Sequence, residues 1–355
     1  MVWVFFIAGL VLLVVGAESL VRGASRLASS LGVPPLVVGL TVVAYGTSTP
    51  EVAVSVQAAL AGQADISLGN VVGSNIFNVL FILGLSAMIA PLIVSRQLVQ
   101  IDVPLMVGTS VVMLVMALDG RISRLDGAIL AALVFVYTAF LVRQAKKERA
   151  EAREAAEAGD GPPPGPTARA WAVNLAYIGA GLGLLVLGSG WFVESSMAIA
   201  RMMGVSELVI GLTIVAAGTS MPEVATSIIA TVRGERDIAV GNVVGSNIYN
   251  ILAVLGFAAL LSPGGVAVAP AALDFDIPVM LAVAVACLPI FFTGHLIARW
   301  EGWLFFGYYV AYTLFLILAS QRHDALPAFS WAMEVFVIPL TAITLIILAV
   351  RARHR

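Results

Sequence analysis

The chain reads Gly46-Thr-Ser-Thr-Pro-Glu51 and then Gly69-Asn-Val-Val-Gly-Ser-Asn-Ile-Phe-Asn78, and it repeats both polar blocks as Gly218-Thr-Ser-Met-Pro-Glu223 and Gly241-Asn-Val-Val-Gly-Ser-Asn-Ile-Tyr-Asn250. All four blocks lie within otherwise apolar stretches. Buried carboxylates and hydroxyls are costly in a low-dielectric medium unless something compensates them, and a cation does so. The duplicated glutamates, Glu51 and Glu223, therefore predict an ion-binding site.

The composition is that of an integral membrane protein. Of the 355 residues, 60% are hydrophobic, only 11% are charged, and 33 are glycines, which are frequent in spanning helices. A spanning helix needs about 20 apolar residues. Eleven segments qualify: 2–21, 34–60, 66–90, 103–118, 124–142, 171–199, 207–232, 238–261, 273–293, 299–319 and 329–350. The sequence predicts an all-α membrane protein, with the first segment kept as a helix because it lacks the pattern of a signal peptide.

The basic residues predict the orientation in the membrane. If alternate loops lie on opposite sides, fifteen of the 19 Lys and Arg residues share one side. These are Arg22, Arg26, Arg96, Arg143, Lys146, Lys147, Arg149, Arg153, Arg169, Arg233, Arg236, Arg299, Arg351, Arg353 and Arg355. The other side has Arg121, Arg124, Arg201 and Arg322. Because cytoplasmic loops carry the basic excess, we expect the N-terminus outside and the C-terminus in the cytoplasm.

The duplication extends over most of the chain. Adding 172 to a position maps Gly9 onto Gly181 and Asn78 onto Asn250, and the shift becomes 174 where Asp102 corresponds to Asp276. Each unit then contains five helices, so the second unit is inverted in the membrane relative to the first, with broken helices at the midplane.

Four parts follow from this repeat. Residues 1–142 are the first five-helix repeat, and residues 143–170 are a cytoplasmic linker that begins as a helix and becomes extended at Pro162-Pro-Pro-Gly-Pro166. Residues 171–319 are the second, inverted repeat, and residues 320–355 are an extra C-terminal helix and a basic tail.

A proline interrupts the second helix of each repeat. Pro50 lacks a backbone N–H, so we expect carbonyls such as that of Ala44 to lose their helical partners. With the neighbouring Thr47, Ser48 and Glu51 they form a cluster of hard oxygens. The second repeat offers the same set from the opposite direction: Ala216, Thr219, Ser220 and Glu223. Calcium prefers such oxygen ligands, and the absence of nearby Cys or His argues against zinc or copper.

The third helix of each repeat adds polar side chains on one face. Ser74 and Asn78 are one turn apart, as are Ser246 and Asn250. Asn70 and Asn242, with their neighbouring glycines, are interpreted as residues of close helix packing. Four aspartates are interpreted as helix N-caps, namely Asp65, Asp237, Asp102 and Asp276. Glu18 and Glu194 are interpreted as helix-end or interfacial residues.

With these motifs the chain resembles the cation/calcium exchanger superfamily, and within it the sodium/calcium exchangers and their prokaryotic relatives. The resemblance covers about residues 1–319 and rests on the paired blocks, which that family calls α-repeats. It implies an antiporter that works by alternating access, with the first and sixth helices as the moving pair. The sixth helix carries the glycines expected in loose sliding contacts: Gly179, Gly181, Gly183, Gly188 and Gly190.

The resemblance also implies roles for individual residues. Calcium would be bound by Glu51, Glu223, Thr47 and Thr219. Sodium would use the same glutamates with Ser48, Ser74, Ser220, Ser246 and the carbonyls of Ala44 and Ala216, while Asn78 and Asn250 would flank the centre. No cofactor is implied, and the expected partners are calcium, sodium and the lipid bilayer, with no nucleic acid.

Three departures from relatives refine the expectation. Asn250 stands where an acidic residue is associated with potassium use, which argues against potassium dependence. Proton/calcium exchangers carry a Glu within the Gly-Asn segment, whereas Gly73 and Ser74 stand here, which favours sodium. The eleventh helix exceeds the usual ten, and both peripheral packing and a contact in a homo-oligomer stay open for it.

The charge of the site predicts the stoichiometry. With Glu51 and Glu223 ionised, one calcium ion gives a neutral site and three sodium ions give a net charge of +1, so we expect electrogenic three-to-one exchange. A proton/calcium antiporter stays open, because either glutamate could titrate. A passive channel fits inverted broken helices less well, an ATP-driven pump would need a phosphate-binding loop, and no nucleophile or metal cluster supports an enzyme.

Overall fold

Helices make up most of the part of the chain that the structure describes. The computed structural model describes residues 1–157, 168–205, 210, 213–214 and 216–353. Within these ranges nine helices are long and apolar enough to cross a membrane, and the bent pair Pro35–Thr47 and Thr49–Leu60 gives a tenth span. These ten match predicted segments. The remaining prediction, 207–232, falls partly on residues outside the described ranges.

The helices and strands of the two repeats follow the same order. The first repeat contains α1 (Val2–Leu31), α2 (Pro35–Val38), η1 (Gly39–Val43), α3 (Ala44–Thr47), α4 (Thr49–Leu60), α5 (Ala64–Phe77), η2 (Asn78–Leu83), α6 (Gly84–Ile89), β1 (Leu92–Ile93), η3 (Leu98–Asp102), α7 (Val103–Ala117), β2 (Arg121–Ile122) and α8 (Arg124–Glu157). The second contains α9 (Ala168–Met202), α11 (Ala216–Gly218), α12 (Met221–Val232), α13 (Arg236–Tyr249), η5 (Asn250–Leu255), α14 (Gly256–Leu261), β3 (Val266–Ala267), η6 (Ala272–Asp276), α15 (Ile277–Phe292), β4 (Leu296–Ile297) and α16 (Arg299–Ser320). The η elements are π-helical turns.

Two helices extend beyond the spans expected from hydropathy. α1 continues to Leu31, beyond the predicted end of the span. Its last turns contain charged residues, but Leu20, Ala24 and Leu27 form a buried face there that packs against the bundle. α8 continues to Glu157, so the linker does begin as a helix, whereas its proline-rich part lies outside the described residues.

Two very short antiparallel ladders join the repeats, and the sequence did not predict them. Leu92 and Ile93 in β1 pair with Ile297 and Leu296 in β4. β2 pairs with β3 in the same way. Each ladder therefore ties a loop of one repeat to a loop of the other.

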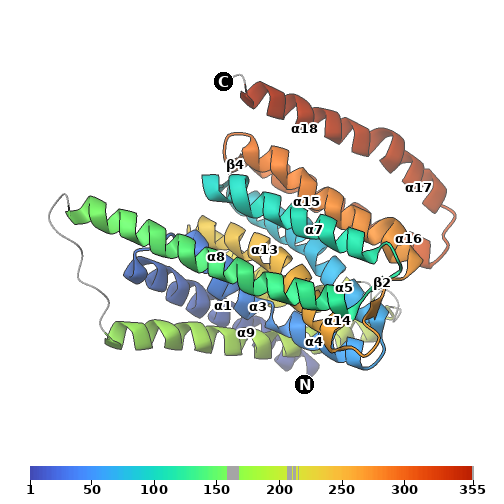
Figure 1. The fold of residues 1–355 in the computed structure, drawn as a ribbon. Coiled ribbons are helices and arrows are strands. Elements are labelled where there is room, and N and C mark those ends of the chain that lie inside the picture. The colour runs from blue at the N-terminus through green and yellow to red at the C-terminus, as the bar shows by residue number, and fades with distance from the viewer. Residues whose placement is uncertain (158–167, 206–209, 211–212, 215, 354–355) are drawn as a thin grey trace.

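α1 and α9, the first helix of each repeat, lie side by side (Figure 1). A Cβ atom on Gly181 would lie 2.6 Å from the backbone N of Leu20, and one on Gly188 would lie 2.8 Å from that of Leu13. The expectation of loose contacts at these two glycines is wrong, because their missing side chains let the two backbones touch. At Gly179, Gly183 and Gly190 nothing lies within 4 Å.

The eleventh helix is formed by α17 (Leu326–Ala332), η7 (Met333–Val337) and α18 (Ile338–Arg353). It lies at the edge of the bundle beside α15 and α16 (Figure 1). An apolar cavity of about 490 Å³ is lined by these same helices. The helix is therefore a peripheral addition to the two repeats.

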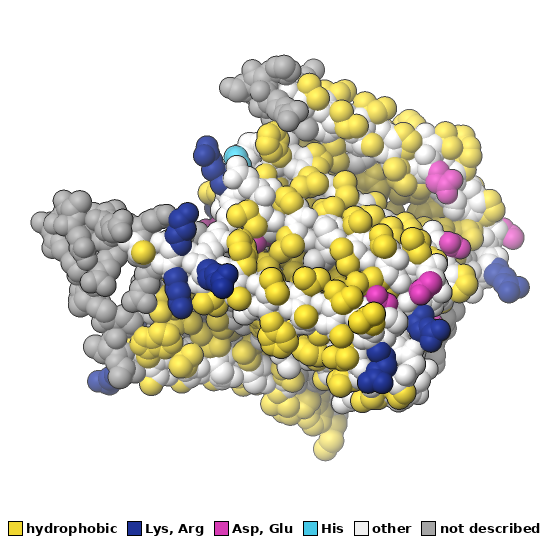
Figure 2. Space-filling view, viewed as in Figure 1, with side chains coloured by type: hydrophobic (Ala, Val, Ile, Leu, Met, Phe, Trp, Pro, Cys, Tyr) yellow, Lys and Arg dark blue, Asp and Glu magenta, His cyan; other side chains and the backbone are white. Residues whose placement is uncertain are grey.

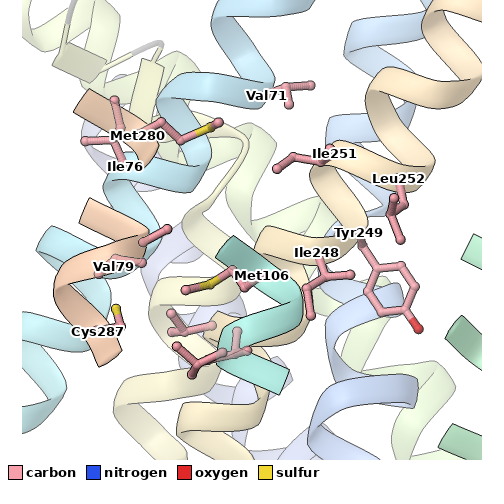
Figure 3. Close-up of a cluster of buried hydrophobic side chains, with 14 of the residues drawn as sticks. Val71, Ile76, Val79, Met106, Ile248, Tyr249, Ile251, Leu252, Met280 and Cys287 are labelled. Carbon is pink, nitrogen blue, oxygen red and sulfur yellow. The ribbon is translucent and has the colours of Figure 1, made fainter. Parts of the chain in front are cut away.

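The surface and the core agree with a membrane location. Hydrophobic side chains cover the middle of the face in Figure 2, and Lys and Arg lie toward its two ends. The main core surrounds α5 and α13, the third helix of each repeat, where Met280 lies beside Ile76 and Met106 beside Ile248 (Figure 3). These two contacts are equivalent in the two repeats.

Candidate ion-binding site

The second helix of the first repeat is broken at Ser48. α3 ends at Thr47, Ser48 has φ −82° and ψ 6°, and α4 starts at Thr49 with Pro50 in its first turn. The two segments are bent by 43°. In the second repeat Ser220, with φ −86° and ψ 10°, precedes α12 in the same way.

The break does not free the Ala44 carbonyl, so that expectation is wrong. The Ala44 oxygen accepts a hydrogen bond from the Ser48 amide at 3.1 Å. A helical bond spans four residues, so Pro50 withholds its donor from Gly46 instead, and Pro222 from Gly218. The Gly218 oxygen accepts a bond from Ser189 Oγ at 3.0 Å. The Ala44 oxygen also lies 3.4 Å from Thr47 Oγ1, which is its second hydrogen-bond partner.

The serines at the two breaks bond across the repeats. Ser48 Oγ lies 3.1 Å from Glu223 Oε1 and 3.0 Å from Ser246 Oγ. Ser220 Oγ lies 3.1 Å from Glu51 Oε1 and 3.1 Å from Ser74 Oγ. Each glutamate is therefore held by the serine of the other repeat, and the site exists only where the two repeats meet.

The threonines bond across the repeats to two asparagines. Thr47 Oγ1 donates to Asn242 Oδ1 at 3.0 Å, and Thr219 Oγ1 donates to Asn70 Oδ1 at 3.0 Å. Asn70 Nδ2 also lies 3.3 Å from the Glu51 carbonyl oxygen. Asn70 and Asn242 thus do more than allow close packing, because they fix the threonines beside the glutamates.

Two serines in this network were missed by the sequence reasoning. Asn70 Nδ2 donates to Ser55 Oγ at 2.9 Å, and Asn242 Nδ2 donates to Ser227 Oγ at 3.0 Å. Both serines are fully buried. They are repeat-equivalent and lie one helical turn after the glutamates, a signal that the duplication already carried.

Asn78 and Asn250 lie where the third helices change from α to π. Asn78 begins η2 and Asn250 begins η5, and single π turns inside α-helices occur frequently at functional sites. Asn78 Nδ2 donates to Asn247 Oδ1 at 3.0 Å, and Asn250 Nδ2 donates to Asn75 Oδ1 at 3.0 Å. Each of these amide nitrogens thereby donates one hydrogen bond to the opposite repeat.

Four buried side-chain oxygens on the predicted site residues accept no hydrogen bond from any described residue. They are Glu51 Oε2, Glu223 Oε2, Asn78 Oδ1 and Asn250 Oδ1. Both glutamates are 1% exposed, and leaving such acceptors unpaired is costly. Each glutamate lies in the first turn of its half-helix, where the positive end of the helix dipole offsets part of the cost of a buried negative charge. Oxygens of these kinds are ligands that hard cations accept.

The arrangement differs from a carboxylate-rich metal centre. Among the residues that the structure describes, no group of three or more His, Cys, Asp or Glu side chains could hold a metal ion. Two carboxylates surrounded by amide and hydroxyl oxygens suit hard cations such as calcium and sodium.

The aspartates interpreted as N-caps have other positions. Gln63 and Glu235 precede α5 and α13, so Asp65 and Asp237 lie inside the first turns. Asp102 and Asp276 lie in continuous helix and make no cap bond. They accept bonds instead, at 3.5 Å from the Tyr137 hydroxyl and 2.8 Å from the Tyr312 hydroxyl respectively.

Glu18 and Glu194 also differ from each other. Glu194 is exposed, whereas Glu18 pairs with Arg22 of its own helix and with Arg233 after α12. Its Oε2 atom lies 2.8 Å from Arg233 Nε. Glu18 therefore connects α1 to the second repeat, a contact that its position near the end of a hydropathy segment did not reveal.

The comparison with known families decides the class of the protein. The profile described as sodium/calcium exchanger protein matches residues 1–143 and 173–318, which are the two repeats. The chain belongs to this family. The profile ends before the eleventh helix.

Several relatives match along most of their length. The inner membrane protein YrbG of Escherichia coli is 40% identical over 284 residues, which cover 79% of this chain and 85% of that protein. The sodium/calcium exchanger MaX1 of Methanosarcina acetivorans is 33% identical, with 88% of this chain and 98% of that protein covered. The putative antiporter CaxA of Alkalimonas amylolytica is 38% identical, with coverage of 80% and 88%.

A solved structure has the same fold. The sodium-calcium exchanger NCX_Mj, soaked with sodium and strontium, superposes with a TM-score of 0.75 at 30% identity and covers 87% of this chain and 96% of its own. The family and fold identify a multi-pass membrane transporter, a cation/calcium antiporter whose substrates are ions.

Proposed function

We propose that this antiporter couples sodium to calcium, with three sodium ions exchanged for one calcium ion. The observation that carries the proposal is the set of four unpaired buried oxygens on Glu51, Glu223, Asn78 and Asn250. Two of them are carboxylate oxygens and two are neutral amide oxygens, so the formal charge of the set is −2 when both glutamates are ionised. One calcium ion neutralises that charge.

The neighbouring oxygens provide additional positions for sodium. Ser48, Ser246, Ser74 and Ser220 extend the set on both sides, with the threonines Thr47 and Thr219 and the carbonyls of Ala44 and Ala216 beside them. Sodium accepts neutral oxygen ligands as well as carboxylates. Three sodium ions leave a net charge of +1, so each cycle would move one charge across the membrane.

The burial of the glutamates supports alternating access over a channel. At 1% exposure for Glu51 and for Glu223, an ion cannot reach either carboxylate unless the surrounding helices move. We infer that α1 and α9 move as one tightly packed pair, because their backbones touch at Gly181 and Gly188. The excess of basic residues on one side supports an orientation with the N-terminus outside and the C-terminus in the cytoplasm.

The test is uptake of radioactive calcium into proteoliposomes loaded with sodium, with a pH gradient in place of the sodium gradient in a second arm. We expect uptake driven by sodium, uptake that responds to an imposed membrane potential, and none with Glu51→Gln. Uptake driven only by the pH gradient would replace sodium by protons at the same glutamates. Sodium-driven uptake that ignores the membrane potential would contradict the stoichiometry.

A further inference from the structure

Two buried asparagines bond to Asn78 and Asn250, the side chains that carry the unpaired amide oxygens of the site. Asn75 and Asn247 are repeat-equivalent, and each is 2% exposed. They lie three residues before Asn78 and Asn250 on α5 and α13. Neither Asn75 nor Asn247 was singled out as a site residue from the sequence.

Asn75 uses its whole side-chain amide in contacts with the second repeat. Its Oδ1 atom accepts from Asn250 Nδ2 at 3.0 Å, and its Nδ2 atom donates to the Asn247 backbone oxygen at 3.3 Å. The same Nδ2 lies 3.6 Å from Met280 Sδ. Because an amide group has two N–H donors and one carbonyl acceptor, both donors of Asn75 are used.

Asn247 makes the same contacts in the opposite direction. Its Oδ1 atom accepts from Asn78 Nδ2 at 3.0 Å, and its Nδ2 atom lies 3.4 Å from the Asn75 backbone oxygen and 3.5 Å from Met106 Sδ. Met106 and Met280 belong to the fourth helices of the repeats and pack on Ile248 and Ile76 (Figure 3). Six contacts thus tie four helices together around the two asparagines.

This pattern fixes the direction of every amide in it. If Asn75 were turned over, its Oδ1 atom would face the Asn247 carbonyl oxygen and its NH2 group would face the NH2 group of Asn250. Two acceptors and two donors would then oppose each other at once. The only arrangement that satisfies the bonds leaves the Oδ1 atoms of Asn78 and Asn250 unpaired.

We propose that Asn75 and Asn247 are positioning residues for ion binding, which hold the carbonyl oxygens of Asn250 and Asn78 toward the ions. The proposal rests on the proposed site at Glu51 and Glu223. A reversed Asn78 or Asn250 would present an NH2 group, whose partial charge is positive, to a cation and would oppose its binding. The two positioning asparagines therefore act on affinity for cations through another side chain.

The test is a double-mutant cycle in proteoliposomes with wild type, Asn247→Ala, Asn78→Ala and the double variant. Sodium-driven calcium uptake gives KM and kcat for each. Loss of a buried hydrogen bond of this kind changes an equilibrium by about tenfold, so we expect Asn247→Ala to raise the KM for calcium about tenfold. In the Asn78→Ala background it should change KM by less than about twofold, because the side chain that it orients is gone.

A matched control lies on the spanning helix that carries Asn75 and Asn78. Ser86 is buried, its repeat-equivalent residue is Ala258, and its hydroxyl accepts or donates no hydrogen bond among the described residues. Ser86→Ala should leave KM unchanged. The mirror variants Asn75→Ala and Asn250→Ala repeat the cycle on the other repeat and replace the first cycle if Asn247→Ala fails to reach the membrane.

The outcomes separate this proposal from the proposed function. An unchanged KM in Asn247→Ala overturns the positioning role while wild-type uptake and its loss in Glu51→Gln still support the exchanger. An equal rise in KM in both backgrounds also overturns it, because it indicates a merely structural role. Absence of sodium-driven uptake in the wild type would reject the proposed function itself.

Discussion

The two repeats match closely at the ion-binding site and differ where α1 and α9 meet the rest of the bundle. At the site, the side-chain bonds between the repeats come in equivalent pairs, as with Ser48 to Glu223 and Ser220 to Glu51. Ions must reach such a site from both sides in turn, and inversion-related oxygens present similar ligands in both directions. The requirement applies to the site and does not extend to α1 and α9.

The contacts that α1 and α9 make with the rest of the bundle are unequal. Glu18 pairs with Arg233, and Ser25 Oγ lies 2.5 Å from Glu235 Oε1, so α1 is tied to the turn after α12. The repeat-equivalent positions on α9 and after α4 hold Gly190, Met197, Ala61 and Gln63, which cannot form these bonds. Likewise Ser189 bonds the Gly218 carbonyl, while Ala17 stands at the equivalent position on α1. The equivalent bonds at the site give ions similar ligands in both directions. The unequal contacts of α1 and α9 can instead make one conformation of the protein more stable than the other.

The largest expected effect tests the equality of the two glutamates. Glu51→Gln and Glu223→Gln each remove one of two buried charges, and such a loss costs about 3–5 kcal/mol, which corresponds to about a hundredfold or more in affinity. Radioactive calcium uptake should be lost equally in both. Glu301→Gln is the control, because Glu301 is buried and lies outside the site, where its carboxylate accepts a hydrogen bond from the Ala298 amide. If one of the two variants keeps calcium uptake, the two glutamates are not equivalent.

The next effect tests the serines at the breaks. Ser48→Ala and Ser220→Ala each remove a donor to a glutamate of the other repeat, and a hydrogen bond to a charged group is worth about 1.5–3 kcal/mol. We expect the KM for sodium and calcium to rise about tenfold or more in each variant. The values should agree with one another within about threefold. A larger difference would show that the ligands on the two sides are not equivalent.

A smaller effect concerns the contact between α1 and α9. A Cβ atom on Gly16 would lie 2.9 Å from the Gly181 oxygen, and overpacking of this kind costs about 1–3 kcal/mol. Gly16→Ala and Gly188→Ala should lower the unfolding temperature in detergent and slow transport. Gly183→Ala is the matched control, because nothing lies within 4 Å of its Cβ position. Normal stability in Gly16→Ala would show that the two helices are not packed this closely.

The smallest effect tests the asymmetric contact itself. Arg233→Gln removes an ion pair whose arginine side chain is 51% exposed, and such pairs are worth about 0.2–1 kcal/mol. The ratio of the calcium KM values at the two membrane faces should shift by up to about fivefold. The shift should shrink at high salt, which screens exposed charges. The double variant Glu18→Arg and Arg233→Glu re-forms the ion pair with exchanged charges and should restore the wild-type ratio. An equal shift in Arg96→Gln would show a general charge effect.

The duplication made much of the site predictable. Because one shift relates Glu51 to Glu223 and Asn78 to Asn250, a residue found in one repeat identified its counterpart, and ten of the spans followed from hydropathy. The same shift would have identified Ser55 and Ser227, which lie one turn beyond the glutamates. These features depend on spacing along the chain.

What could not be predicted depends on contacts between distant segments. The bonds of Asn75 and Asn247 form only where α5 and α13 come together, since the partners lie about 170 residues apart along the chain. The carbonyl released by Pro222 is taken by Ser189 of another helix, and the π turns at Asn78 and Asn250 have no sequence pattern of their own. Asp102 and Asp276 look like caps in the sequence because tyrosine partners 35 and 36 residues later cannot be recognised there.

The interlocking of the broken helices also constrains how the protein is made. Until the second repeat has been inserted, Ser48 lacks Glu223, Thr47 lacks Asn242, and β1 lacks its partner strand β4. In a bilayer no water replaces such partners, so the newly made first half carries unsatisfied polar groups through the synthesis of some 150 further residues. A half-length product should therefore be recognised and degraded as an incomplete protein, and quality control in the membrane would act as a check on complete synthesis.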